Sequence, residues 1–299
     1  MRAPRSVLAV PASNLEMAGK ALASAADAVF LDLEDAVVPD EKASARGKIV
    51  SALRELDWRD RQTLYRANAL DTPYFYRDVI EVAEEAGERL DGIIIPKVQR
   101  PADLHVAATL LSQIELSVGL ESGRIKLEAQ IESAAGLADI DAISRATDRL
   151  EALHFGPGDF AASLRMPYRS IGAMDEWDEA YPGHRFHYAM QRIVVAARAA
   201  GLRAVDGPLA DYRDEEALRR SSLLARSLGF DGKWCIHPAQ IPVVNEVFSP
   251  TDKEIEWAKK VVGAYEEAGA GATSVDGQMI DAASIKMART TLDRVPEEG

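Results

Sequence analysis

The stretch QIESAAG at residues 130–136 and the stretch HFGPGDF at residues 154–160 share the arrangement that decides the fold of this chain. In each, an apolar run typical of a buried strand leads into small residues and one acid, Glu132 in the first and Asp159 in the second. Side chains at the carboxyl ends of the strands of a (β/α)8 barrel converge on one face. The two stretches therefore predict barrel strands that bring two carboxylates together at the barrel mouth.

The small residues beside Glu132 and Asp159 leave room for a hydrated cation. Mg²⁺ prefers oxygen ligands, keeps several waters and needs few protein carboxylates when substrate oxygens complete its shell. We therefore expect these two residues to hold Mg²⁺. The alternative is that both are ordinary loop or capping acids, because Asp and Glu are common at helix starts.

Eight strand-like runs alternate with helical stretches along most of the chain. Apolar residues recur at helical spacing between most of these runs, for example at 77–86 and 188–200. This alternation predicts a parallel sheet with crossover helices, and eight repeats fit a closed barrel better than an open sheet. We therefore expect an α/β fold with a (β/α)8 TIM barrel as the catalytic domain over residues 1–248. The expected strands are 6–10, 28–32, 63–66, 92–96, 127–131, 153–155, 203–205 and 232–236.

The remaining residues, 249–299, predict a small C-terminal helical lid domain, because the segment is too short to build a large core of its own. Cap residues and the glycines at 269 and 271 divide this segment into separate secondary-structure elements. Its expected elements are a helix at 253–267 capped by Ser249 or Thr251, a hinge-like stretch at 268–272, a short hairpin or turn at 274–281, and a final helix at 282–294.

The chain of 299 residues carries 48 acidic and 35 basic residues, a net charge of −13. Nucleic-acid binding needs a concentrated basic surface, so we expect no nucleic-acid partner. The single cysteine, Cys235, cannot form an intramolecular disulfide, and the apolar run near residue 10 is too short for a signal or a membrane span. We expect a cytoplasmic protein without membrane association, in which Cys235 is a buried core thiol.

The stretch LDLEDA at residues 31–36 ends the second strand-like run with three acids close together. So much like charge must meet a cation, solvent or hydrogen-bond donors. We expect Glu34 and Asp35 to hold metal-bound water and Asp32 to cap the loop. Helix capping is the alternative for Asp35.

Arg66 ends the third run, where a buried aliphatic residue would be expected if the strand simply continued. Its planar fork suits a carboxylate or an enolate oxygen of a keto acid substrate, although a structural pair with Glu34 or Asp35 is the alternative. Lys97 follows the fourth run and is expected at the substrate. A Schiff base on Lys97 is a second way to stabilise a carbanion, which we rank below the metal because acids crowd the same face.

The histidines carry less information. His237 follows the eighth run, where we favour a structural loop role over that of a general base. His184 and His187 have no evident partner, and we expect them on the surface or in loops.

Taken together, these motifs resemble the citrate lyase beta-subunit-like group of the HpcH/HpaI aldolase superfamily, and within it the malyl-CoA lyases. The resemblance spans nearly the whole chain, and its stretches are highly specific in combination. The matching stretches are FLDLEDAV at 30–37, RAN at 66–68, DTP at 71–73, IPKV at 95–98, IESAAG at 131–136, GDFAAS at 158–163, DGP at 206–208 and GKWCIHP at 232–238.

The resemblance implies roles for these residues. Glu132 and Asp159 would coordinate Mg²⁺, Arg66 would contact the substrate carboxylate and carbonyl, and Glu34 and Asp35 would support the metal waters. The C-terminal lid of the family carries a catalytic aspartate that reaches the site of a neighbouring subunit. The stretch GQMID at residues 277–281 matches that motif, so Asp281 is the candidate acid/base in a homo-oligomer, a trimer or hexamer, whose lid acts on the neighbouring subunit.

The implied activity is that of a Mg²⁺-dependent carbon-carbon lyase. It would interconvert malyl-CoA, or a methylmalyl-CoA or citramalyl-CoA relative, with an acyl-CoA and a 2-keto acid such as glyoxylate. A thioesterase acting on malyl-CoA and an aldolase acting on a free substrate are the enzymatic alternatives. A non-catalytic acyl-CoA-binding barrel subunit is a further one, which the presence of the complete set of candidate residues disfavours.

One stretch departs from the family pattern. Malyl-CoA lyases tend to show a Pro-Gly-Ser-Arg type of turn after the first strand, and its basic residue helps to hold CoA. Here the stretch reads PASN at residues 11–14, and Lys20 is the nearby basic residue that we expect at the substrate.

Overall fold

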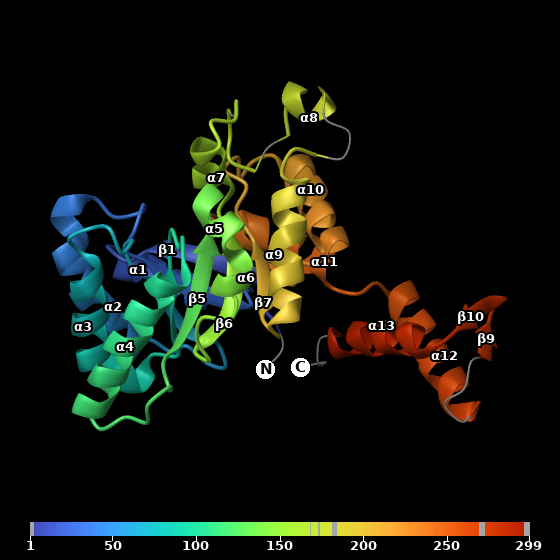
Figure 1. Ribbon diagram of the computed structural model, residues 1–299, viewed down its shortest axis with the longest axis horizontal. Coiled ribbons are helices and arrows are strands. Elements are labelled where there is room, and N and C mark those ends of the chain that lie inside the picture. Colours follow the sequence, from blue (N-terminus) through green and yellow to red (C-terminus); the bar gives the residue numbers. More distant parts are fainter. Residues whose placement is uncertain (1–2, 168, 173, 181–183, 269–272, 296–299) are drawn as a thin grey trace. The chain divides into compact units, whose positions relative to one another are not determined.

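The computed structural model describes residues 3–167, 169–172, 174–180, 184–268 and 273–295 (Figure 1). It divides into two compact units, one covering Pro4–Asn245 and the other formed mainly by Glu246–Gly299. The division falls close to the expected boundary at residue 248.

The first unit is a closed barrel of eight parallel strands that neighbour one another in chain order, which confirms the predicted TIM barrel (Figure 1). Each strand-like run of the sequence is one of these strands, because short apolar runs between turn residues are favoured where both faces are covered. The strands are β1 (Ser6–Pro11), β2 (Ala28–Asp32), β3 (Thr63–Arg66), β4 (Gly92–Ile95), β5 (Lys126–Ile131), β6 (Leu150–Phe155), β7 (Arg203–Asp206) and β8 (Gly232–Cys235).

Helices connect the strands. The helices predicted at 77–86 and 188–200 are α3 and α9, and α3 buries one apolar face that includes Val79 and Val82. The helices of this unit are α1 (Leu15–Leu22), α2 (Lys42–Glu55), α3 (Phe75–Ala86), α4 (Pro101–Ser117), α5 (Ala134–Ala138), α6 (Ile140–Ile143), α7 (Pro157–Ser163), α8 (Glu176–Ala180), α9 (His187–Ala199) and α10 (Glu215–Leu228), with 3-10 turns η1 (Pro39–Glu41), η2 (Gly87–Arg89) and η3 (Pro238–Gln240); α11 (Ile241–Phe248) follows η3.

The barrel interior is a packed apolar cluster, and polar residues follow it toward the carboxyl ends of the strands, where the site lies. Side chains of a strand alternate between its two faces, so every second residue points inward. Phe30 and Leu64 belong to the interior cluster, and two residues further along their strands come Asp32 and Arg66. The barrel therefore changes from an apolar core to a polar end at the carboxyl ends of its strands. Cys235 on β8 is fully buried and burial raises its thiol pKa to about 12, as expected of a core thiol.

The second unit contains the elements predicted at the C-terminus. Helix α12 (Asp252–Glu267) begins at Thr251, whose hydroxyl exchanges hydrogen bonds with Glu254 in a capping box, so Thr251 rather than Ser249 is the cap. Strands β9 (Thr273–Val275) and β10 (Gln278–Ile280) form an antiparallel hairpin, and α13 (Ala282–Asp293) follows. A small core of this unit contains Ala258, Val261, Ile280 and Ala288. Most of the expected hinge, residues 269–272, lies outside the described residues.

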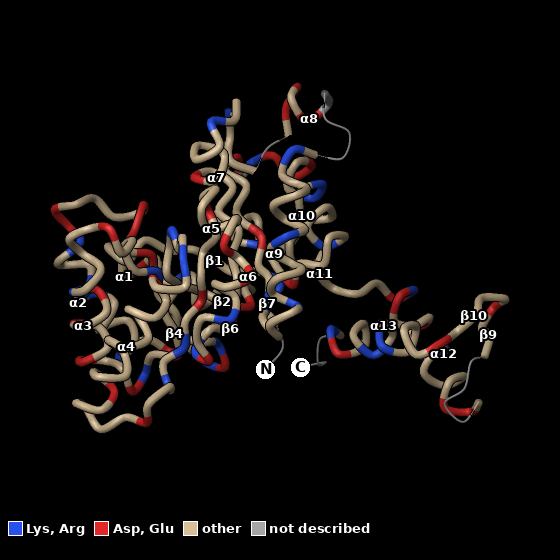
Figure 2. Tube along the Cα trace, viewed as in Figure 1, with Lys and Arg blue, Asp and Glu red and all other residues tan. Residues whose placement is uncertain are grey.

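Lys and Arg are interspersed with Asp and Glu along the described trace rather than gathered on one element (Figure 2). None of the described helices combines the length and the apolar character that a bilayer crossing requires.

Candidate active site

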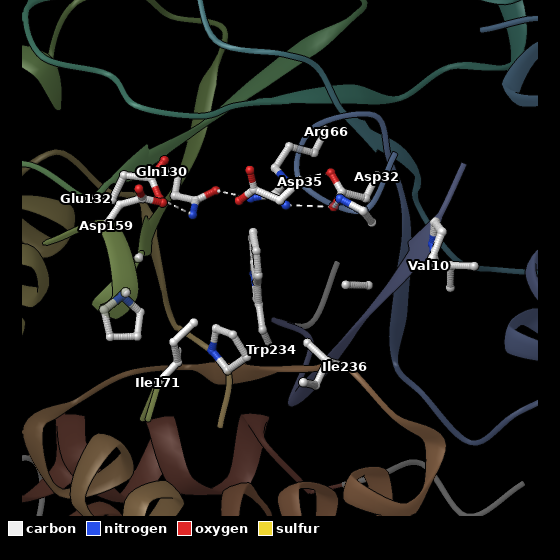
Figure 3. Close-up of a pocket in the computed structure, with 17 residues that line it drawn as sticks. Val10, Asp32, Asp35, Arg66, Gln130, Glu132, Asp159, Ile171, Trp234 and Ile236 are labelled. Atoms are coloured by element: carbon white, nitrogen blue, oxygen red, sulfur yellow. Dashed lines mark hydrogen bonds and ion pairs between the residues drawn. The ribbon is translucent and has the colours of Figure 1, made fainter. Parts of the chain in front are cut away.

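A cavity of about 350 Å³ opens at the carboxyl ends of the barrel strands (Figure 3). Its wall is mostly apolar, with a row of charged and amide side chains along one side, as is usual for small-molecule sites. The lining residues are Ala9, Val10, Pro11, Asp32, Asp35, Ala36, Arg66, Gln130, Glu132, Gly156, Pro157, Gly158, Asp159, Ile171, Pro208, Trp234 and Ile236.

Arg66 lies in the middle of the polar row and is held by Asp32. Its Nε donates a 2.7 Å hydrogen bond to Asp32 Oδ1, and its Nη2 donates a 2.7 Å hydrogen bond to Asp32 Oδ2. This is the bidentate geometry of the strongest charged pairs. Its Nη1 donates to Gln130 Oε1 at 3.3 Å and lies 2.8 Å from Glu34 Oε2. Burial lowers the pKa of Arg66, but the charge and hydrogen bonds of Asp32 outweigh it, so the pKa is raised and the guanidinium stays charged.

Asp32 has the loop-capping role expected of it as well. Its two oxygens accept hydrogen bonds from the backbone N–H groups of Glu34 and Ala36. One buried carboxylate thus fixes both the loop after β2 and the guanidinium of Arg66.

Glu34 is buried and is not among the described residues that line the cavity. Only 6 % exposed, it pairs with Arg66 at 2.8 Å and with Lys97 Nζ at 3.0 Å. The structural pair between Arg66 and Glu34 that the sequence left open is therefore present. Asp35, by contrast, is exposed and lines the cavity.

Burial lowers the pKa of Lys97, but the hydrogen bond and charge of Glu34 outweigh it, with help from Asp159 and Asp35, so its pKa is raised. An amine with a raised pKa is protonated at neutral pH and is a poor nucleophile. This environment disfavours a Schiff base on Lys97.

Glu132, directly after β5, has a fixed carboxylate. Gln130 Nε2 donates to its Oε2 at 2.6 Å and the backbone N–H of Lys97 donates to its Oε1 at 2.7 Å. A Cβ added at Gly156 would lie 2.4 Å from Glu132 Oε2. The absence of a side chain at Gly156 is therefore what leaves space beside this carboxylate.

Asp159, in the first turn of α7, lines the cavity near Glu132 (Figure 3). Burial first, and then the negative charges of Glu34 and Asp159, raise the pKa of Glu132 to about 8, although Arg66 opposes them. The pair expected from the sequence is thus brought to one cavity, and its two charges repel each other.

These residues fit a divalent cation. The carboxylates of the site outnumber its cations, Arg66 and Lys97; burial is the main cause of the raised pKa of Glu132, and the negative charges of Glu34 and Asp159 add to it. Among the described residues there is no group of three or more His, Cys, Asp or Glu arranged to hold a metal. Two carboxylates, Glu132 and Asp159, are enough for Mg²⁺, which prefers oxygen ligands and retains several waters.

Besides Glu34, three predicted site residues, Lys97, Lys20 and Asp281, are not among the described residues that line the cavity. Lys20, on α1, is largely exposed and pairs with Glu16 at 2.6 Å. Asp281, in the second unit, caps α13 by accepting hydrogen bonds from Ala283 and Ser284. His237 caps η3 by accepting a hydrogen bond from the backbone of Ala239, in agreement with a structural role.

The sequence did not predict functional positions for Gln130 and Trp234, both of which line the cavity. A signal for Gln130 was present, because Glu128, Gln130 and Glu132 are polar at every second residue of an otherwise apolar strand, which places all three on one face. Nothing local marks Trp234, since a tryptophan at a strand end is usually core.

Comparison with known proteins agrees with this geometry. The HpcH/HpaI aldolase/citrate lyase family matches residues 5–238. The L-malyl-CoA/beta-methylmalyl-CoA lyase of Cereibacter sphaeroides is 43 % identical over 296 residues, covering 96 % of this chain and 93 % of that protein. The (3S)-malyl-CoA thioesterase of the same species is 38 % identical over 295 residues, covering 96 % and 93 %.

Among solved structures, the protein CitE from Mycobacterium tuberculosis in complex with magnesium, acetoacetate and coenzyme A has a TM-score of 0.79 and 30 % sequence identity, with 99 % of each chain covered. The barrel, the paired carboxylates at its mouth and these similarities over nearly the whole length lead to one conclusion: this chain belongs to the HpcH/HpaI aldolase/citrate lyase family.

Proposed function

We propose that this protein is a Mg²⁺-dependent carbon-carbon lyase that interconverts malyl-CoA, or a methylmalyl-CoA or citramalyl-CoA relative, with an acyl-CoA and a 2-keto acid such as glyoxylate. The observation that carries the proposal is the convergence of Glu132, Asp159 and Arg66 on one cavity at the barrel mouth. The similarity to a malyl-CoA lyase over 96 % of the chain supports it.

In this proposal Glu132 and Asp159 hold the metal. A bound Mg²⁺ would supply Lewis-acid polarisation of the keto acid oxygens and neutralise the repulsion between the two carboxylates. Gln130 and the backbone of Lys97 keep Glu132 in place before the metal arrives, so little reorganisation accompanies binding.

Arg66 stabilises negative charge on the substrate. Asp32 occupies the edge of the guanidinium formed by Nε and Nη2. The substrate would therefore contact the part of the Arg66 guanidinium that faces the cavity. The buried apolar wall, including Val10 and Trp234, would exclude water from the acyl carbon and so favour carbon-carbon chemistry over hydrolysis.

We propose Asp281 as the group that exchanges a proton with the acyl carbon, in the site of a neighbouring subunit of a homo-oligomer, either a trimer or a hexamer. The match of residues 277–281 to the family motif supports this role. Hydrogen bonds from Ser284 lower the pKa of Asp281, which keeps the carboxylate ionised and able to accept a proton in the condensation direction.

A thioesterase is the second candidate, favoured by the 38 % identity to a (3S)-malyl-CoA thioesterase. The two activities give different products. Incubation of malyl-CoA with the protein and Mg²⁺ yields acetyl-CoA and glyoxylate if the protein is a lyase, but malate and free CoA if it is a thioesterase.

Chromatography of the CoA esters distinguishes these outcomes, and a panel of acyl-CoA and keto acid pairs identifies the preferred substrate. Product formation from none of the pairs, with Mg²⁺ binding intact, would instead favour a non-catalytic acyl-CoA-binding subunit.

A further inference from the structure

Three buried side chains from three different strands form a hydrogen-bonded chain inside the barrel. Trp234 Nε1 on β8 donates to His154 Nδ1 on β6 at 2.8 Å, and His154 Nε2 lies 2.7 Å from Glu128 Oε2 on β5. None of the three is more than 4 % exposed. The surrounding interior is apolar, so this row of hydrogen-bonded polar side chains calls for a physical explanation.

The chemistry of the indole decides the protonation of His154. An indole N–H only donates hydrogen bonds, so the nitrogen that faces it, His154 Nδ1, must carry a lone pair. The ring proton is then on Nε2, which donates to Glu128. His154 is therefore a neutral imidazole of defined tautomer, and protonation at Nδ1 would break its bond to Trp234.

Glu128 is anchored at the opposite end from the cavity. Its Oε1 accepts a 2.6 Å hydrogen bond from Arg203, the first residue of β7. Burial raises the pKa of Glu128, but the charge of Arg203 and the hydrogen bond to His154 outweigh it, so the pKa is lowered and Glu128 accepts both bonds as a carboxylate. The chain thus connects the amino-terminal end of the barrel to Trp234.

Trp234 connects this chain to the active site. It lines the cavity, and the Arg66 guanidinium lies over its ring at 5.3 Å from the centroid. Phe30 contacts the ring in a tilted arrangement with 4.6 Å between centroids. Figure 3 shows the Trp234 side chain reaching toward the row that contains Arg66 and Gln130. Rotation of the indole would therefore remove both a wall of the cavity and a contact of Arg66.

We propose that Glu128 and His154 are positioning residues that fix the orientation of Trp234, and that Trp234 in turn forms a wall of the cavity and supports the face of the Arg66 guanidinium, whose edge Asp32 holds. The role of Arg66 in this inference rests on the proposed function. Apolar side chains of similar volume often replace buried ionic groups at no cost in stability, so an orienting role accounts for these hydrogen-bonded side chains better than a purely stabilising one.

Two substitutions of His154 test this inference. His154→Phe removes both hydrogen bonds and keeps an apolar ring of similar size. His154→Gln can keep both, because its amide offers one acceptor for Trp234 and donors for Glu128. The matched control is Leu153→Val, a buried neighbour on β6 whose side chain points to the other face of the strand.

The expected pattern is kinetic rather than structural. His154→Phe should keep the circular dichroism spectrum and oligomer of the wild type, while kcat/KM for the CoA ester falls on the order of 10- to 100-fold through misplacement of Arg66. His154→Gln should recover most of this loss. Leu153→Val should change the unfolding temperature but not the kinetics. Wild-type kinetics in His154→Phe, or an equal loss in the Phe and Gln variants, would overturn the inference.

A spectroscopic measurement on the unmodified protein is independent of the activity. ¹⁵N NMR of the histidine side chains should show His154 as a neutral ring with an unprotonated Nδ1 at pH 7, and the Trp234 indole N–H should resist hydrogen exchange. In His154→Phe this protection should be lost. The indole N–H resonance of Trp234 is identified as the one that disappears in Trp234→Phe. A protonated His154, or an indole N–H that exchanges freely in the wild type, contradicts the positioning role of Glu128 and His154 even if the lyase activity is established. Absence of lyase activity, with these hydrogen bonds intact, contradicts only the proposed function.

Discussion

The backbone N–H of Lys97 donates a 2.7 Å hydrogen bond to Glu132 Oε1, and Lys97 adopts a left-handed backbone conformation with φ of 52°. Residues other than glycine rarely adopt positive φ, and where they do the surrounding structure must stabilise the strain. Here the strained residue follows β4 and orients a carboxylate that follows β5. The backbone of one strand end therefore fixes a candidate metal ligand on the next.

Removal of the metal should abolish turnover. With EDTA the protein should be inactive, and Mg²⁺ should restore activity. Glu132→Gln should weaken Mg²⁺ binding, measured by calorimetry without substrates, while leaving the fold intact. Full activity in the presence of chelator would exclude the proposed metal role.

The pKa of Glu132 predicts how the stability of the metal-free protein depends on pH. Because burial and neighbouring carboxylates raise this pKa from 4.5 to about 8, the folded state holds a proton that the unfolded state releases. The contribution of Glu132 to stability is therefore fully present below pH 4.5 and is lost as the pH rises to about 8. Thermal unfolding in EDTA should show this decline, and Glu132→Gln should reduce it. A decline of the same size in the variant would assign it to other groups.

Gly156→Ala should impair the metal site through sterics alone. The new Cβ would lie 2.4 Å from Glu132 Oε2, so the carboxylate must move and Mg²⁺ affinity should fall. Gly47→Ala on α2 is the matched control, because nothing lies within 4 Å of its added Cβ. The control should keep wild-type Mg²⁺ affinity and gain up to about 1 kcal/mol of unfolding free energy. Equal Mg²⁺ affinity in the two variants would remove Gly156 from the site.

Arg66→Lys keeps the charge but loses the planar fork that binds Asp32. We expect kcat/KM to fall, with a loss of about 2 to 4 kcal/mol of transition-state stabilisation. Arg149→Lys is the control, since Arg149 is also buried and bound to a carboxylate, that of Glu115, but precedes β6 at the amino-terminal end of the barrel. It should lower stability without changing kinetics. A kinetic loss of similar size in both variants would indicate that Arg66 acts only through the fold.

Asp281→Asn should keep the fold, the oligomer and Mg²⁺ binding but lose carbon-carbon cleavage, because an amide cannot exchange a proton with the acyl carbon. Complementation tests whether the lid acts in trans. Mixing inactive Asp281→Asn with inactive Glu132→Gln, under conditions of subunit exchange, should regenerate activity. Verified mixed oligomers without activity would place Asp281 in its own subunit's site or outside the mechanism.

The sequence by itself determined the eight strands, the small C-terminal hairpin and helices, and the acids at the strand ends. These features are local: apolar runs between turn residues predict strands, and barrel geometry places whatever follows a strand at the mouth. Glu132, Asp159 and Arg66 could be chosen as candidates for this reason.

Only the tertiary structure decided which side chains meet. The partner of Arg66 is Asp32, 34 residues away, and the partner of Trp234 is His154, 80 residues away. Such pairs depend on the register between strands and on closure of the barrel, which no local pattern encodes. The same dependence explains why Glu34 is not among the described residues that line the cavity, because a position near a strand end does not fix the direction of a side chain. Lys20 lies on the helix α1 and is exposed, which the sequence position alone did not reveal.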